Sequence, residues 1–250
     1  MRRFRENLIK MTSGANYGPQ TAKRWPCGRR AGWLSRTVRS LRKVTSIPQM
    51  IGGRRSNLLL FAVTLVELVI LLRQTTSFTM VDWIYLSQNV LVLGISLTRR
   101  EPVAQDQSWP ASIAVTISYI YPYAQVIYLN SIDGYVAWPA GGTALVSFSA
   151  LLSLAALLSI GKLFGVRPAM RGLAIKGPYQ LVRHPMYLAY FIADIGYQLQ
   201  EWNTGTVLIV VAGWAALVYR IYAEERMLSL HPDWVAYVGR APYRLIPGLW

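Results

Sequence analysis

Apolar residues gather in six separate segments that follow a long polar N-terminal stretch. These segments cover residues 57–72, 81–97, 111–129, 141–160, 186–199 and 206–222. A helix needs about 20 apolar residues to cross a bilayer, so only the third and fourth segments are long enough alone. The others need their flanks or packing against protein. The pattern predicts an all-α integral membrane protein with about six transmembrane helices. A four-span arrangement, with the first or fifth segment re-entrant or interfacial, is the alternative.

Three prolines indicate where helices begin or bend in these segments. Pro110 and Pro185 stand where a first helical turn is expected, and a missing backbone donor is harmless there. Pro122 lies inside the third segment and is expected to kink it.

The distribution of charge predicts the topology. The chain of 250 residues is 53% apolar and 15% charged, with a net charge of +15. Of its 26 Lys and Arg residues, 14 lie in residues 1–56. Cytoplasmic loops collect Lys and Arg, so six crossings with both termini in the cytoplasm leave only Arg73 on the far side. We therefore expect a multi-pass membrane protein with cytoplasmic N- and C-termini.

Residues 1–56 are basic, rich in Gly and Ser, and show no sustained apolar period, so they are expected to be mostly disordered. They fit a cytoplasmic tail that touches anionic lipid, an organelle transit peptide, or a start codon assigned too early. Residues 57–160 then form four membrane helices. Residues 161–250 are expected to form a catalytic region with two further membrane helices.

Several classes of site are poorly supported. Cys27 is the single cysteine, and His184 and His231 are the only histidines. No HExxH, GxGxxG or GxxxxGK[ST] pattern occurs. We therefore expect no metal, no dinucleotide-binding sheet and no P-loop. The basic charge is concentrated in the tail, so no specific nucleic-acid partner is expected either.

The C-terminal third carries an ordered set of motifs. Gly177 to Tyr179 forms a GxY element, Arg183 to Tyr187 reads RHPMY, and Glu224 to Leu228 reads EERML after an apolar hairpin. This order resembles the isoprenylcysteine carboxyl methyltransferase and phospholipid methyltransferase superfamily, in which GxY, RHPxY and EExxL occur in sequence.

The resemblance implies S-adenosylmethionine as cofactor, bound at a cytoplasmic site. Carried over by position, the arginine that faces the methyl acceptor is Arg220, which we take as the catalytic residue. The cofactor-binding residues would be Arg171, Gly172, Leu173, Ala174, Tyr179, His184, Pro185, Met186, Tyr187 and Glu224.

The chemistry of these residue types agrees with such roles. A helix that opens at Pro185 offers backbone donors and a positive dipole end to a carboxylate. Glu224 can accept from an ammonium or a ribose hydroxyl, and tyrosine rings can face a sulfonium cation. Arg220 can orient an acceptor carboxylate, which is already ionised and needs no general base. An amine acceptor would need a base, for which Glu225 and His184 are the nearby candidates.

Membrane embedding implies a lipid-like acceptor in contact with membrane lipids. A prenylated cysteine carboxylate is the family precedent, and phospholipid amines, small thiols and isoprenoid acids meet the same requirement. An NADPH-dependent sterol-type reductase and a non-catalytic membrane scaffold are the other hypotheses. Glu67 and Asp194 lie inside apolar segments, where ionisable groups are costly. Neither belongs to the family pattern, and a buried hydrogen bond between helices is the simplest role for each.

Overall fold

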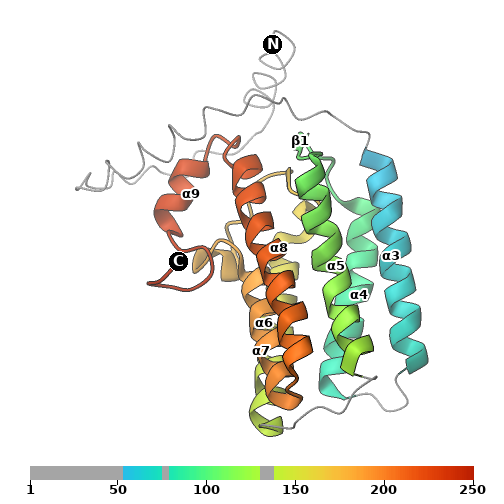
Figure 1. Cartoon of the computed structure of the whole chain (residues 1–250). Helices are drawn as coiled ribbons and strands as arrows, with labels where there is room; N and C mark the ends of the chain where they lie inside the picture. The colour runs from blue at the N-terminus through green and yellow to red at the C-terminus, as the bar shows by residue number, and fades with distance from the viewer. Residues whose placement is uncertain (1–52, 75–78, 130–137) are drawn as a thin grey trace. The chain divides into compact units, whose positions relative to one another are not determined.

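The computed structural model describes residues 53–74, 79–129 and 138–250 (Figure 1). They all fall in one compact unit, Ser46–Trp250. Most of the predicted tail, including Cys27, lies outside the described residues. Its last four residues are helical, because the first described helix begins at Gly53 and not at the predicted residue 57.

All six apolar segments are helices. They are α3 (Gly53–Gln74), α4 (Met80–Thr98), α5 (Trp109–Leu129), α6 (Pro139–Ile160), α7 (Pro185–Gln200) and α8 (Thr204–Leu228). Figure 1 shows the six lying side by side with their axes roughly aligned. Their positions were predicted correctly, with ends that extend the apolar segments by a few residues.

Five short elements were not predicted. They are the helix α9 (Trp234–Arg240), the 3-10 turns η2 (Gly161–Leu163) and η3 (Gly177–Gln180), and a pair of two-residue strands. The strands β1 (Ala104–Gln105) and β2 (Ala169–Met170) pair antiparallel, with Ala104 opposite Met170. The all-α prediction therefore needs one correction, a minimal strand pair that joins the loop after α4 to the loop after α6.

Three of the described helices are long and apolar enough to cross a membrane: Met80–Thr98, Pro139–Leu163 and Thr204–Leu228. The helix α7 has only 16 residues. The helix α3 has 22 residues and contains Glu67 and Arg73, and the helix α5 has 21 residues and contains several tyrosines. The chain is thus a helical membrane protein, and the count of six spans stays a prediction.

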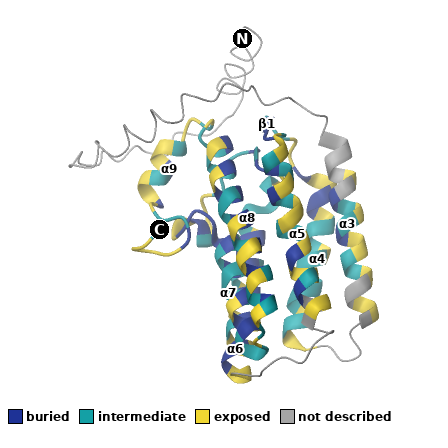
Figure 2. Cartoon of the chain, in the orientation of Figure 1, coloured by how far each residue is buried: buried dark blue, intermediate teal, exposed yellow. Residues whose placement is uncertain are grey.

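The outward faces of the helices are apolar. Large hydrophobic side chains such as Leu58, Val66, Ile127, Phe148 and Leu208 are more than half exposed, and exposed residues recur along the outer sides of the bundle in Figure 2. A soluble protein rarely exposes so much contiguous apolar surface. These faces suit contact with lipid chains.

Residues at the helix ends explain where several helices begin. Thr79 and Asp82 form a capping box at α4, and Asn203 accepts a hydrogen bond from the Gly205 backbone at α8. Pro185 occupies the first turn of α7, as predicted. Pro122 stands inside α5, which continues through it as one helix to Leu129.

Small residues allow the closest helix crossing. The helix α6 packs along α7, α5 packs along α8, and α3 packs mainly against α4. A Cβ atom placed on Gly142 of α6 would lie 2.5 Å from the carbonyl oxygen of Gly196 on α7. Glycine at both positions therefore lets the two backbones touch, as small residues do in membrane helix pairs.

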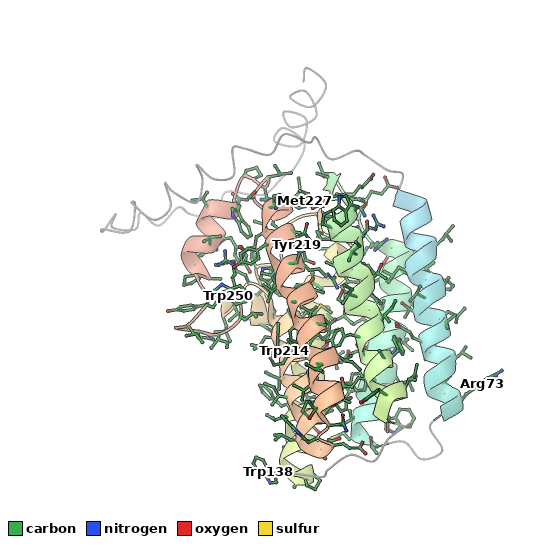
Figure 3. All side chains as sticks on the ribbon, viewed as in Figure 1. Arg73, Trp138, Trp214, Tyr219, Met227 and Trp250 are labelled. Atoms are coloured by element: carbon green, nitrogen blue, oxygen red, sulfur yellow. The ribbon has the colours of Figure 1, made fainter. Side chains whose placement is uncertain are left out.

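One end of the bundle carries the polar loops, and we call it the site end. Residues 99–108, 161–184 and 229–250 lie there, together with α9 (Figure 1). Arg73 and Trp138 mark the opposite end in Figure 3. The strand pair β1–β2 holds two of the site-end loops together, and this positions the residues of the candidate site.

Candidate active site

A cavity of about 450 Å³ opens inside the site end and continues between the helices. Side chains from α3 to α9 and from the loop after α6 line it. The predicted site residues on its wall are Arg171, Gly172, Leu173, Ala174, Tyr179, His184, Met186, Tyr187, Arg220 and Glu224. The exception is Pro185, which is fully buried as the first residue of α7. Thus ten of the eleven predicted residues share one cavity wall.

Arg171 is a buried cation on this wall. Its guanidinium packs against Gly165, where a Cβ atom would collide with it. Burial, with a further contribution from the nearby charge of Arg99, lowers the pKa of Arg171 to about 10, so it stays positive at neutral pH. Within the described part of the chain, no atom accepts a hydrogen bond from its Nε. Arg171 is therefore suited to bind an anionic group of a ligand.

Tyr179 is positioned by the turn that precedes it. Gly177 has φ of 59°, a left-handed conformation that favours glycine, and a Cβ atom there would collide with the Ser159 hydroxyl. This explains the glycine of the GxY element. Tyr237 of α9 donates a hydrogen bond to the Tyr179 carbonyl oxygen at 3.0 Å. Burial raises the pKa of Tyr179, so its ring is a neutral wall of the cavity.

The RHPMY and EE elements meet across α7 and α8. The Tyr187 hydroxyl donates a hydrogen bond to Glu224 Oε1. The rings of His184 and Tyr187 stack with their centroids 5.7 Å apart. His184 occupies the N-cap position of α7, but its side chain makes no capping hydrogen bond. Its Nδ1 lies 3.9 Å from Glu224 Oε2. The two motifs thus form one polar cluster around Tyr187.

Arg220 lies at the centre of this cluster and is held from three sides. Its Nη1 donates to Ser118 Oγ at 2.7 Å and its Nη2 to the Val166 carbonyl oxygen at 2.8 Å. The guanidinium carbon lies 5.3 Å from the centre of the Tyr187 ring. Arg220 Nε is a second buried nitrogen with no acceptor among the described residues. The Arg220 guanidinium is therefore already fixed in orientation, and its Nε can still donate a hydrogen bond to a ligand.

Glu225 has a role that sequence reasoning missed. It accepts hydrogen bonds from Arg183 Nε at 2.7 Å and from Arg244 Nε at 2.9 Å, and its Oε1 lies 3.4 Å from His184 Nε2. Arg183 also donates to the carbonyl oxygens of Ala241 and Pro242. We call Arg183, Glu225 and Arg244 the clasp. It joins the start of α7, the end of α8 and the C-terminal segment. The sequence signals for it were the doubled glutamate and the arginine of RHPMY.

Two further carboxylates face the cavity nearer the middle of the bundle. Asp194 accepts from the Tyr121 hydroxyl at 3.0 Å and from Trp214 Nε1 at 2.7 Å. Glu67 accepts from the Tyr123 hydroxyl at 2.9 Å. Each acid therefore forms the interhelical hydrogen bond expected from the sequence. Both also line the cavity.

Comparison with known protein families identifies one match. Residues 142–230 match the model of the isoprenylcysteine carboxyl methyltransferase (ICMT) family. The resemblance seen in the sequence is confirmed over these residues. The matched region spans α6 to α8 and includes the RHPMY and EE elements, so it contains most of the cavity wall described above. No curated protein and no solved structure matches the chain.

The ICMT match has a direct consequence for the reaction class. It supports a membrane methyltransferase, in agreement with the apolar helices. The cluster around Tyr187 is also built almost entirely from the matched residues. In the described chain, no three His, Cys, Asp or Glu side chains are grouped to hold a metal ion.

Proposed function

We propose that the chain transfers a methyl group from S-adenosylmethionine to a lipid-like acceptor, and that the acceptor group is a carboxylate such as that of a prenylated cysteine. The observation that carries this proposal is the convergence of Arg220, Tyr187 and Glu224 on one wall of a cavity between membrane helices. The ICMT match supports the reaction class.

The residues present fit the methyl donor. The cavity of about 450 Å³ falls within the range of about 300–1,000 Å³ typical of small-molecule sites. Glu224 can accept from the ammonium or ribose hydroxyls, and the free Nε of Arg171 can donate to the methionine carboxylate. Tyr179 and Tyr187 offer aromatic faces to the adenine or the sulfonium. When bound, S-adenosylmethionine supplies an electrophilic methyl group.

Arg220 would orient the acceptor. A carboxylate is ionised at neutral pH, so the transfer needs alignment and exclusion of water but no general base. Ser118, Val166 and Tyr187 hold the guanidinium in place, which reduces the cost of ordering it on binding. Its free Nε can then take part in a hydrogen bond to one carboxylate oxygen.

We also propose that the site end faces the cytoplasm. The basic residues of the described loops, among them Arg100, Lys162, Arg167 and Arg240, belong to the site end, whereas Arg73 is at the opposite end (Figure 3). This asymmetry follows the positive-inside rule. On this proposal, the cavity opens to the compartment in which S-adenosylmethionine is made.

Calorimetric titration of S-adenosylhomocysteine and of NADPH into detergent-purified protein tests the proposal. We expect S-adenosylhomocysteine to bind at micromolar affinity, to lose at least about tenfold in Glu224→Ala, and to be unaffected in Glu101→Ala. Glu101 is an exposed carboxylate at the same end and serves as the matched control. Binding of NADPH alone would refute the proposal and indicate a reductase. Binding of neither ligand would favour a non-catalytic membrane scaffold.

A second assay addresses the acceptor. Tritiated methyl transfer to a farnesylated cysteine with a free carboxylate is compared with transfer to the corresponding amide. Methylation of the acid but not of the amide is expected. Transfer only to phospholipid amines or to a thiol would refute a carboxylate as the acceptor group, but the protein would still be a methyltransferase.

A further inference from the structure

The cavity continues well beyond the place where methyl transfer is proposed. Ser118, Arg220 and Tyr187 mark the reaction level, because Arg220 contacts both of the other two there. Asp194 follows Tyr187 by seven helical residues, and Trp214 precedes Arg220 by six, so both lie about 10 Å deeper at 1.5 Å per residue. Figure 3 shows Trp214 farther from the site end than Tyr219 and Met227. Asp194 still lines the same cavity.

The deep part of the cavity is lined by phenol and carboxylate groups. Its two carboxylates, Glu67 and Asp194, come from α3 and α7. Its tyrosines come from α4, α5 and α7, and we call this lining the tyrosine chamber: Glu67, Tyr85, Tyr121, Tyr123, Asp194 and Tyr197. A cavity shaped for a bare hydrocarbon chain would not need this lining.

Among the described residues, the two acids of the chamber are hydrogen-bonded only by neutral side chains. The hydrogen-bond donors to Asp194 and Glu67 are the neutral groups of Tyr121, Trp214 and Tyr123. The ion pairs of the described chain involve neither acid. Carboxylates away from water are costly unless a cation compensates them, and aromatic faces add favourable interactions with an ammonium group.

We propose that the tyrosine chamber binds an ammonium group carried by the acceptor, about 10 Å from the group that is methylated. The inference rests on the proposed function for the reacting end of the acceptor. It adds a recognition element that favours, among lipid-like carboxylate acceptors, one that also carries a cationic group. The ammonium group is not itself methylated, because it lies about two helical turns below the reaction level.

The chamber also reaches the lipid-facing side of the bundle. The helix α3 packs mainly against α4, and the Tyr123–Glu67 hydrogen bond bridges it to α5. Tyr123 is 45% exposed although it lines the cavity. The boundary between α3 and α5 is therefore a route by which an apolar tail can leave the chamber for the bilayer while the ammonium group stays beside Glu67.

The test compares choline with 3,3-dimethylbutan-1-ol, its neutral isostere, in a maltoside detergent that carries no ammonium group. Binding of each probe is followed by saturation-transfer difference NMR, with S-adenosylhomocysteine affinity measured on the same samples. The variants are Asp194→Asn and Glu67→Gln, whose amide oxygens can still accept from the native donors, and Glu101→Gln is the exposed control.

Choline should bind about tenfold more tightly than the neutral probe to the wild type. Either amide variant should reduce that preference several-fold without weakening S-adenosylhomocysteine binding, and Glu101→Gln should leave it unchanged. Equal binding of the two probes to the wild type would overturn the inference even if the variants do not fold. A preference that survives both substitutions would also overturn it. Absence of S-adenosylhomocysteine binding to the wild type would instead refute the proposed function.

Discussion

Removing the Glu225 carboxylate should destabilise the fold, whereas removing that of its neighbour Glu224 should weaken ligand binding. Glu225 is the shared acceptor for Arg183 and Arg244, and the Arg183 side chain is only 4% exposed. Breaking a buried ion pair by deleting one partner costs about 3–5 kcal/mol, because a charge is left uncompensated. Among the described residues, Glu224 accepts one hydrogen bond, from Tyr187, and its contacts with Arg220 and His184 are longer, at 3.9 Å. Loss of one hydrogen bond costs about 1 kcal/mol.

These magnitudes translate into separable melting shifts. For a protein of this size, 1 kcal/mol moves the midpoint by about 2–4 °C, so Glu225→Ala should unfold roughly 10 °C lower and Glu224→Ala only a few degrees lower. Tryptophan fluorescence in detergent, scanned at one fixed heating rate, measures both, because unfolding of such proteins is commonly irreversible. S-adenosylhomocysteine titration at 10 °C, where both variants remain folded, measures binding.

The expected result is a crossed pattern, with the large thermal loss in Glu225→Ala and the large affinity loss in Glu224→Ala. Glu225→Gln should fall between Glu225→Ala and the wild type, since its amide oxygen can accept one guanidinium hydrogen bond. A melting point for Glu225→Ala within about 2 °C of the wild type would refute the clasp as a structural element. A greater thermal loss in Glu224→Ala would reverse the two roles.

Three other predictions concern single contacts. Arg220→Ala should retain S-adenosylhomocysteine binding but lose at least about 100-fold in turnover, because the acceptor loses its orienting group. The exposed control Arg226→Ala should keep both binding and turnover. A loss of S-adenosylhomocysteine affinity in Arg220→Ala as large as its loss of turnover would show that Arg220 does not act on the acceptor. Gly142→Ala should lower the melting midpoint by several degrees, since the added methyl group meets Gly196. Gly94 has open space around it, so Gly94→Ala should leave the midpoint unchanged. Equal midpoints for the two variants would contradict the close crossing of α6 and α7. Tyr237→Phe removes the donor to the Tyr179 carbonyl and should cost about 1 kcal/mol of stability with weaker S-adenosylhomocysteine binding; unchanged affinity would show that α9 does not support Tyr179.

Local pattern was sufficient to predict the six helices. Each apolar segment is long enough to specify a helix by itself, and features such as Pro185 at a first turn depend only on neighbouring residues. The motifs likewise predicted the cluster of His184, Tyr187, Arg220 and Glu224, because their order in the sequence resembles a family. Ten of the eleven predicted site residues lie on the cavity wall.

The missed features depend on residues far apart in the chain. The strand pair joins residues 104–105 to 169–170, and two-residue strands leave no recognisable period. The clasp joins Arg183 to Glu225 and Arg244. The motifs contain Arg183 and Glu225, but no local pattern indicates that they pair with each other or with Arg244. The tyrosines of the chamber come from three helices, so their convergence could be seen only once the helices were packed.

The sparse packing between α3 and α5 has a practical consequence for purification. Detergent monomers are themselves single-chain amphiphiles, and a boundary that admits the tail of an acceptor would admit theirs as well. Turnover measured in micelles should then fall as detergent concentration rises, in the manner of a competitive inhibitor, while S-adenosylhomocysteine affinity at the site end stays constant. Reconstitution into nanodiscs would remove that competition and give the truer rate.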